Sequence, residues 1–428
     1  ARSFLNRFIF QNSMKTVEIM APVGNWECLQ AAIQGGCNAV YFGVEQLNMR
    51  ARATNNFILE DLKEIGEKCK QAKIKSYLTV NTILYDHDIQ LMKKIVDAAK
   101  EADITSIIIS DVAALQYCKE KGVSCHISTQ ANITNIETVK FYALFADVMV
   151  LARELTLQQV GSIVKEIEKE NIRGPSGELV CIEIFAHGAL CVAVSGKCYM
   201  SLHTYNSSAN RGACLQNCRR SYIVTDKETG EELEIDNEFI MSPKDLCTID
   251  FLDKVLDTGV TVLKLEGRAR APEYVYTVTK CYREAADAVL TNTYTPERIM
   301  KWKEALSTVY NRGFWEGYYL GKKLGEWSGV YGSQATKTKI YKGSVTNWYA
   351  QPQVAAVYLD AGDLVVGDEI LITGPTTGVI QTRVDSLFQE EKASMIGKQN
   401  SIISFPLSQK IRPKDKVYVL KAKEEGKQ

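Results

Sequence analysis

Five cysteines gather in one stretch of the chain. They run Cys191-x6-Cys198-x15-Cys214-x3-Cys218 and, after 28 intervening residues, reach Cys247. Thiolates are soft ligands, so cysteines that converge favour zinc or an iron–sulfur cluster. Structural zinc sites typically pair their cysteines two to four residues apart, and only Cys214 and Cys218 have that spacing. The spacing favours a cluster, with zinc and unligated thiols as the two alternatives.

The same stretch is basic and aromatic. Residues 184–225 contain no Asp or Glu, whereas Arg219, Arg220, Tyr199 and Tyr205 all lie within them. An RNA surface needs cations for the phosphates and rings for unstacked bases, and this stretch supplies both. An ordinary solvated loop, or positive charge that offsets the thiolates of a cluster, explains the pattern equally well. RNA binding is therefore one of several interpretations at this point.

The surrounding sequence predicts the scaffold that must position these residues. Apolar, β-branched runs alternate with helical patterns, as in a parallel sheet that is covered on both faces. The predicted strands are 17–22, 39–43, 76–81, 106–110, 125–130, 148–153, 180–185 and 262–268. Eight such strands fit an α/β fold with a closed (β/α)8 barrel. No Gly-x-Gly-x-x-Gly follows the first strand, which disfavours an open dinucleotide-binding sheet.

Active sites of such barrels lie at the carboxyl ends of the strands. Polar residues occupy six of those ends: Asn81, Gln130, Arg153, His187, Glu266 and Arg268. Any one of them could merely cap a strand. Six at one rim predict a polar pocket, although they do not name a reaction.

Changes in composition divide the chain further. Residues 1–13 form an extension before Met14, and residues 14–294 form the predicted barrel with a cysteine-rich insertion at 188–245. A helical linker is expected at 295–334. Short alternating strands and turn signals over 335–428 predict a small antiparallel β-barrel.

Charge and hydropathy limit the classes of function. The chain has 51 Lys and Arg and 51 Asp and Glu, so any affinity for nucleic acid must come from a local patch. Hydrophobic residues make up 46%, which excludes a largely disordered protein. No apolar run approaches the roughly 18 residues of a spanning helix, and the N-terminus lacks the features of a secretory signal. A cytoplasmic protein is expected.

Several segments resemble the collagenase-like peptidase family U32. The resemblance extends from about residue 17 to residue 320. The length and the predicted C-terminal barrel are similar to the tRNA-hydroxylation branch of that family; the larger ribosomal-RNA hydroxylases and the smaller ubiquinone-pathway proteins fit less well. The matching segments are Glu18-Ile-Met-Ala-Pro-Val-Gly-Asn25, Ala39-Val-Tyr-Phe-Gly43, Asn48-Met-Arg-Ala-Arg-Ala53, 183–191, 195–201, 211–220, 242–247 and Leu265-Glu-Gly-Arg268.

The resemblance implies oxygen-independent hydroxylation with a 4Fe-4S cluster. In the tRNA branch it implies 5-hydroxylation of the wobble uridine, with prephenate as the source of the hydroxyl. By motif, the cluster ligands are Cys191, Cys198, Cys214 and Cys247, with Cys218 as a substitute ligand. The peptidase name has no support in the motifs, because the chain has neither His-Glu-x-x-His nor Gly-x-Ser-x-Gly. A metal- or Cys-dependent peptidase and an RNA-binding module with structural zinc remain alternatives.

Roles follow for the predicted pocket if its ligand is a dicarboxylate such as prephenate. Such a ligand needs planar bidentate partners, which favours Arg153 and Arg268. Lys264 and His187 are expected as supporting donors, and Glu266 would hold a cation or act on a proton. Asn81 and Gln130 complete the substrate-binding set.

The RNA partner implied by the resemblance is the anticodon arm of tRNA. Tyr199 or Tyr205 is expected to stack on the wobble base, and Arg219 and Arg220 belong to the acid-free segment that would hold phosphates. The basic tail from Lys410 to Lys427 and the C-terminal barrel are expected to grip the RNA backbone.

Overall fold

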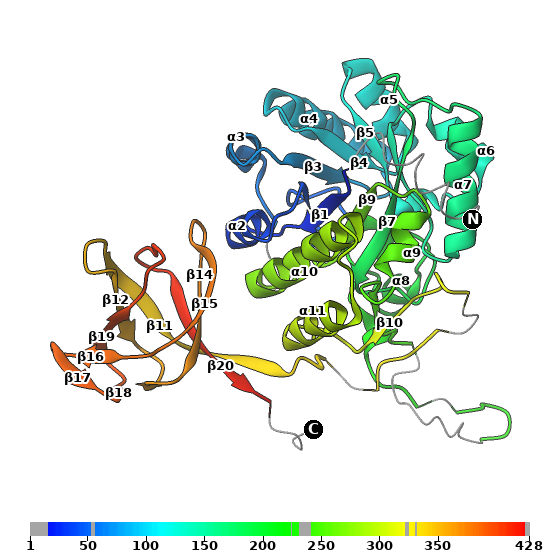
Figure 1. Cartoon of the computed structure of the whole chain (residues 1–428). Coiled ribbons are helices and arrows are strands. Elements are labelled where there is room, and N and C mark those ends of the chain that lie inside the picture. The colour runs from blue at the N-terminus through cyan, green and yellow to red at the C-terminus, as the bar shows by residue number, and fades with distance from the viewer. Residues whose placement is uncertain are drawn as a thin grey trace.

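Eight parallel strands close into a barrel, as the alternation along the sequence predicts (Figure 1). Neighbours pair in the order β7-β6-β5-β4-β3-β2-β1-β9, and β9 also pairs with β7, which closes the ring. The strands are β1 (Glu18–Pro22), β2 (Ala39–Phe42), β3 (Lys75–Val80), β4 (Ser106–Ile109), β5 (Cys125–Ile127), β6 (Val148–Val150), β7 (Cys181–Gly188) and β9 (Val262–Leu265).

This computed structural model describes residues 16–52, 56–223, 225–230, 241–321, 325–329 and 332–423. The predicted N-terminal extension, residues 1–13, lies outside the described residues. No helix within the described ranges combines the length and the apolar character that crossing a membrane requires.

Helices surround the barrel and bury one face each. In α4, Met92, Ile95 and Ala99 are buried at three- and four-residue spacing, which places them on one side of the helix. Asn25 starts α2 because its side chain accepts a hydrogen bond from the backbone N–H of Cys28. The helices are α2 (Trp26–Gln34), α3 (Leu62–Gln71), α4 (Ile89–Glu101), α5 (Val112–Lys121), α6 (Ile136–Tyr142), α7 (Leu157–Lys169), α9 (Leu252–Asp257) and α10 (Pro272–Leu290).

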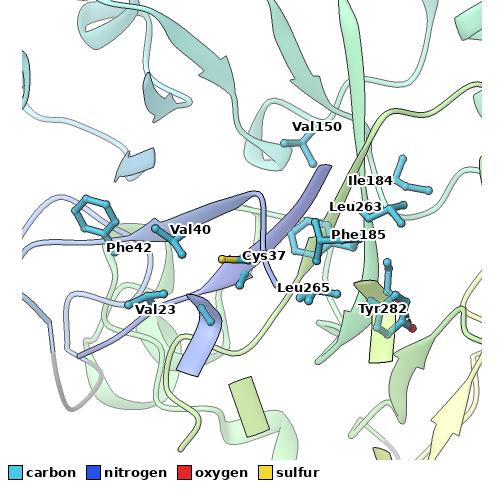
Figure 2. Close-up of a cluster of buried hydrophobic side chains, with 14 of the residues drawn as sticks. Val23, Cys37, Val40, Phe42, Val150, Ile184, Phe185, Leu263, Leu265 and Tyr282 are labelled. Atoms are coloured by element: carbon cyan, nitrogen blue, oxygen red, sulfur yellow. Dashed lines mark hydrogen bonds between the residues drawn. The ribbon is translucent and has the colours of Figure 1, made fainter. Parts of the chain in front are cut away.

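The core between strands and helices is aliphatic and aromatic. Figure 2 shows part of it, with Val40 and Phe42 from β2 and Leu263 and Leu265 from β9, all fully buried. Truncating one such leucine to alanine typically costs about 2–5 kcal/mol. This packing holds the carboxyl ends of the strands in place, and the polar residues that follow the strands are positioned by it.

The cysteine-rich insertion interrupts the alternation between β7 and β9. The end of β7 pairs antiparallel with β8 (Asp245–Cys247), and β10 (Phe314–Trp315) adds to β8. Gly188, the last residue of β7, has a φ of 106°, and a Cβ there would lie 2.5 Å from the carbonyl oxygen of Glu266. Glycine is therefore required at this close approach. The insertion also holds α8 (Met200–Tyr205) and the 3-10 helices η5 (Ala209–Arg211) and η6 (Asn217–Arg219).

The C-terminal part is antiparallel, as its turn signals predict. Eight strands form one sheet in the order β15-β14-β20-β11-β12-β19-β16-β17, and β13 and β18 form a separate pair. The strands are β11 (Lys337–Tyr349), β12 (Val354–Leu359), β13 (Leu364–Val365), β14 (Glu369–Gly374), β15 (Gly378–Arg383), β16 (Leu387–Gln389), β17 (Lys392–Ser394), β18 (Ile396–Gly397), β19 (Ser401–Pro406) and β20 (Lys416–Ala422).

The C-terminal sheet lies against the outside of the barrel, beside α2 and α10 (Figure 1). The side-chain amide of Gln34 on α2 donates to the carbonyl oxygen of Thr377 at 2.8 Å and accepts from the backbone N–H of Val379 at 2.9 Å. Lys339 on β11 forms a 2.7 Å ion pair with Glu273 on α10. Helix α11 (Pro296–Thr308) lies between the barrel and the sheet in sequence.

Candidate active site

A cavity of about 130 Å³ opens at the carboxyl ends of the barrel strands. It is roughly as large as the engineered protein cavity that accepts a benzene ring. Strand ends and the cysteine-rich insertion build it together. Its polar and charged lining includes Tyr41, Arg50, Thr79, Asn81, Ser128, Gln130, Arg153, Cys191, Cys198, Cys214, Cys218, Lys264, Glu266 and Arg268.

Four cysteines of the insertion line this cavity, and Cys247 does not. Cys191, Cys198, Cys214 and Cys218 are exposed or half-buried at its edge. Cys247 instead lies buried on β8, where the hydroxyl of Tyr282 is 3.8 Å from its sulfur. Burial raises the pKa of the Cys247 thiol to about 11. Burial also raises the pKa of the Cys218 thiol, so position at the cavity, and not acidity, separates the two cysteines.

The donor set around this cavity consists of thiols. Within the described ranges, no three His, Cys, Asp or Glu side chains converge closely enough to hold one metal ion. A tetrahedral zinc site would need its sulfurs about 2.3 Å from one centre. A cluster has several irons and therefore holds its thiolates farther apart, around a larger space. Four cysteines around one cavity fit that requirement.

A buried carboxylate organises the cations of the cavity. Glu266 follows β9 and forms a 3.0 Å ion pair with Arg50, and the hydroxyl of Tyr41 donates to its other oxygen at 3.0 Å. Burial works against its charge, but Arg50, Arg153 and Arg268 lower the pKa of Glu266 to about 2. The group is a permanent anion and a weak base, so it is suited to holding cations rather than to taking a proton.

Arg268 is the buried cation beside Glu266. Its guanidinium donates to the hydroxyl of Thr79 at 2.9 Å, across the barrel mouth. Burial lowers the pKa of Arg268 to about 10, so the group stays charged at neutral pH. Gly43 makes room for it, because a Cβ there would lie 2.6 Å from the guanidinium and 2.7 Å from the side chain of Asn48.

The floor of the cavity is an ion pair inside the barrel. The ammonium of Lys264 lies 2.8 Å from one oxygen of Glu183 and 4.6 Å from the centre of the Tyr41 ring. The other oxygen of Glu183 lies 3.6 Å from Nδ1 of His126. Burial opposes the charge of Glu183, yet Lys264 and His126 lower its pKa. The floor thus carries a fixed cation with its own counter-ion beneath it.

Amide and hydroxyl groups form one polar wall. The side-chain amide of Asn81 donates to the hydroxyl of Ser128 at 3.1 Å and to Gln130 at 3.3 Å. Ser128 in turn donates to Gln130. Asn81 also accepts from the backbone N–H of Met49. These contacts tie the ends of β3 and β5 and the loop after β2 into one surface that can donate and accept hydrogen bonds.

Besides Cys247, five predicted site residues lie away from the cavity lining. His187 is buried beside Tyr282, and burial lowers its pKa to about 3, so it is neutral and offers no charge to an anion. Arg219 donates to the carbonyl oxygens of Leu190 and Pro243 and thereby holds the insertion in place. The others lie at the surface around α8: Tyr199, which is 69% exposed, Tyr205, and Arg220, which donates to the Tyr205 hydroxyl at 2.6 Å.

Some lining residues were not predicted from the sequence. Arg50 is the most consequential, because it pairs with Glu266 across the mouth. It lies in the Asn48–Ala53 segment that resembles the family, so that motif could have identified Arg50 as a site residue. Tyr41 and Thr79 point inward from β2 and β3, but their strand patterns do not distinguish a polar lining residue from a core residue.

Comparison with known proteins identifies related sequences. Residues 24–329 match peptidase family U32. A protein named "Collagenase" from Porphyromonas gingivalis (strain W83) is 56% identical over 95% of this chain and 99% of its own length. "tRNA hydroxylation protein P1" from Bacillus subtilis (strain 168) is 30% identical over 93% of this chain and 94% of its own. "23S rRNA 5-hydroxycytidine C2501 synthase" from Escherichia coli (strain K12) is 32% identical over 65% of this chain and 40% of its own.

Proposed function

The chain belongs to peptidase family U32, and from this membership and the geometry of the cavity we propose that it is an iron–sulfur enzyme that hydroxylates RNA without O2. The favoured reaction is 5-hydroxylation of the wobble uridine in tRNA with prephenate as co-substrate. In such a reaction the hydroxyl of the co-substrate replaces the hydrogen on the base carbon, and that hydrogen passes to the co-substrate. The single observation that carries the proposal is the gathering of four cysteines and four cations around one cavity.

We assign the cluster to the four cysteines that line the cavity. Cys191, Cys198, Cys214 and Cys218 would hold a 4Fe-4S cluster, so Cys218 takes the place that the motif assigned to Cys247. When bound, the cluster supplies a redox-active centre with Lewis-acidic iron. Burial lowers the pKa of Arg50, but the neighbouring Glu266 raises it by more. Cys191 and Cys214 lie close enough to Arg50 that their thiolates raise its pKa further.

The cations are suited to an anionic co-substrate. Arg50, Arg153, Lys264 and Arg268 line the cavity against one lining carboxylate, Glu266. Guanidinium groups bind carboxylates with two parallel hydrogen bonds, which fixes orientation as well as charge. Glu266 holds the arginines in place, and the wall of Asn81, Ser128 and Gln130 is available to the edge of a base. With the cations assigned to the co-substrate and the amide wall to the base, the dicarboxylate would lie near the barrel axis.

The peptidase alternative has less support from the same cavity. A cysteine peptidase needs an imidazole within hydrogen-bond reach of its thiol. In the part of the chain that the structure describes, no histidine lines the cavity, and His187 is buried and neutral. Glu266, with a pKa of about 2, is a poor base for activating water.

Two measurements test the proposal. The full chain, purified without oxygen, should be brown and contain iron and acid-labile sulfide. Expressed in a bacterial host that lacks its own tRNA hydroxylation proteins, it should introduce 5-hydroxyuridine, measured by mass spectrometry of nucleosides from isolated tRNA. The Cys191→Ser variant is the matched control and should lack both the cluster and the modified nucleoside.

Other outcomes would replace the proposal. A colourless protein that contains zinc and binds RNA without modifying it would indicate a binding module. Cleavage of a collagen peptide by the purified chain, abolished in the same variant, would indicate a peptidase. Hydroxycytidine in ribosomal RNA, or a hydroxylated ubiquinone precursor, would keep the chemistry and change the substrate.

A further inference from the structure

A second cavity lies on the other side of one wall of the active site. It measures about 40 Å³. Both cavities are lined by Arg153, Cys191, Val192, Ala193 and Ser195, so this short segment and one arginine separate them. The remaining lining of the second cavity is largely aromatic and apolar: Glu154, Leu190, Pro243, Trp315, Tyr318, Gly325 and Trp327.

The aromatic side comes from residues beyond the barrel and is firmly held. Trp315, on β10, donates its indole N–H to the carbonyl oxygen of Lys244 at 3.0 Å. The ring of Tyr318 meets Trp315 edge to face, with 5.4 Å between centres. Trp327 forms an antiparallel bridge with Pro243 and is 38% exposed. Trp315 and Tyr318 are therefore held by contacts of their side chains, and the indole of Trp327 is partly exposed.

Arg153 supplies unused hydrogen-bonding capacity at the shared wall. Its guanidinium stacks 4.0 Å from the centre of the Phe185 ring and makes one long hydrogen bond, 3.4 Å, to the carbonyl oxygen of Ala189. Its buried Nε has no hydrogen-bond partner among the described residues. A buried donor without a partner is unfavourable, so an acceptor for this group would be favoured.

We propose that this second cavity is a stacking subsite for the nucleotide next to the one that is hydroxylated. Trp327 would stack on the neighbouring base, and Arg153 would donate to a base carbonyl or to the linking phosphate. The second cavity is too small to enclose a base. A base would therefore lie at its opening, with one face of the ring stacked on the exposed indole of Trp327. The shared wall allows consecutive nucleotides to occupy the two cavities. This inference rests on the proposed function, because it takes RNA as the substrate.

Two features indicate what occupies the second cavity: it adjoins the active-site cavity, and the cation Arg153 lines it. A small apolar ligand would leave Arg153 unsatisfied, whereas a nucleotide brings both a ring and an anionic or carbonyl oxygen. The site differs from the exposed tyrosines of α8, since Tyr199 and Tyr205 do not line either cavity. Stacking on an aromatic side chain tolerates any base, so the subsite would contribute affinity and register rather than sequence recognition.

The test is binding of an anticodon stem-loop RNA, measured by fluorescence anisotropy on the full chain. The Trp327→Ala variant should lose about 5- to 150-fold in affinity, the range expected for one stacked base. Trp327→Phe should retain most of it, because a ring remains. The matched control is Phe141→Ala, an exposed aromatic residue on α6 that lines neither cavity, which should bind as the wild type does.

A blunt-ended duplex without a loop separates stacking from charge. It should bind wild type and Trp327→Ala equally, since it has no unstacked base to offer. Equal stem-loop affinity in both proteins, with the wild type still hydroxylating tRNA, would overturn the subsite and leave the proposed function intact. The subsite would also be overturned if Trp327→Ala bound the dicarboxylate more weakly but bound RNA as tightly as the wild type does. If the wild type neither binds nor modifies RNA, the proposed function itself fails.

Folding of the variant is checked in the same series. Circular dichroism should be unchanged in Trp327→Ala, and Trp327→Leu provides a second ring-free variant if the alanine proves unstable. Quenching of tryptophan fluorescence by the stem-loop should be smaller in Trp327→Phe than in the wild type. Identical quenching in the two would count against a base at this indole.

Discussion

The barrel mouth and the C-terminal sheet handle charge in opposite ways. At the mouth, Glu183, Lys264 and Arg268 are buried, Glu266 beside them is half-buried, and these groups stabilise one another's charges. In the C-terminal sheet the core is largely aliphatic, and ion pairs such as Lys337–Glu369 lie at the surface. The buried carboxylate of Asp415 there accepts hydrogen bonds from the Thr377 hydroxyl and the backbone N–H of Arg412 and has no buried cation as partner among the described residues. Burying charges costs free energy that apolar residues of similar volume would not, so a structure that needed only stability would not require them.

This contrast locates function in the barrel mouth. Perturbed, buried ionisable groups gather at sites that perform chemistry. The C-terminal sheet resembles an ordinary stable core with a polar surface, which suits a contact role. Substitutions should therefore have large, specific effects at the mouth and small, graded effects on the sheet. The following predictions test that difference.

The largest effect is expected at the cysteines. Cys218→Ala should abolish the visible absorption of the anaerobically purified protein, because it removes one of the four thiolates that line the cavity. Cys247→Ala should retain the absorption, since that thiol is buried against Tyr282. Iron content and visible spectra measure both. Retained colour in Cys218→Ala with loss in Cys247→Ala would restore the ligand set that the motif implied.

A large effect is also expected at Arg268, whose planar guanidinium can donate two parallel hydrogen bonds to a carboxylate. Arg268→Lys keeps the charge but loses the planar pair of donors, so hydroxylation should fall at least about tenfold. The steady-state rate of 5-hydroxyuridine formation measures it. Arg383→Lys on β15 is the matched control and should change little. Near-wild-type turnover in Arg268→Lys would remove this residue from the site.

An intermediate effect concerns stability at low pH. The pKa of Glu266 is about 2 in the folded protein and 4.5 otherwise, so its contribution is present above about pH 4.5 and is lost as pH falls toward 2. This shift corresponds to about 3 kcal/mol. Unfolding by denaturant at several pH values should show a steeper acid loss in the wild type than in Glu266→Gln. Glu369→Gln, in a surface pair, should leave the slope unchanged.

The smallest effect is expected on the C-terminal sheet. Lys410→Glu and Lys416→Glu should each weaken tRNA binding a few-fold and reduce the salt dependence by about one counter-ion per lysine. Lys165→Glu on α7 is the control. Point substitutions are preferable to deletion of residues 335–428, because the sheet covers α2 and α10. Unchanged salt dependence in both variants would argue that the sheet does not hold the RNA.

The sequence by itself determined the scaffold and the strand-end residues. Alternation of apolar strands with helical patterns is a local property, and it predicted the closed barrel and its order. Glu266 and Arg268 follow directly from it, because residues just after a barrel strand lie at the mouth. His187 does not, because β7 continues to Gly188 and leaves this side chain buried within the strand. The antiparallel character of the C-terminal part was equally local, since turn residues and period-two alternation define it.

Only the tertiary structure decided which loop residues face the cavity. Cys218 and Cys247 have similar claims by type and motif, yet pairing of β8 with the end of β7 places Cys247 against Tyr282 and leaves Cys218 at the cavity. Arg50, in the loop after β2, lines the active-site cavity, and Trp327, from beyond the barrel, lines the second cavity. The orientation of a side chain in a strand is set by its neighbours along the chain, whereas in a loop it is set by long-range contacts that no local pattern encodes.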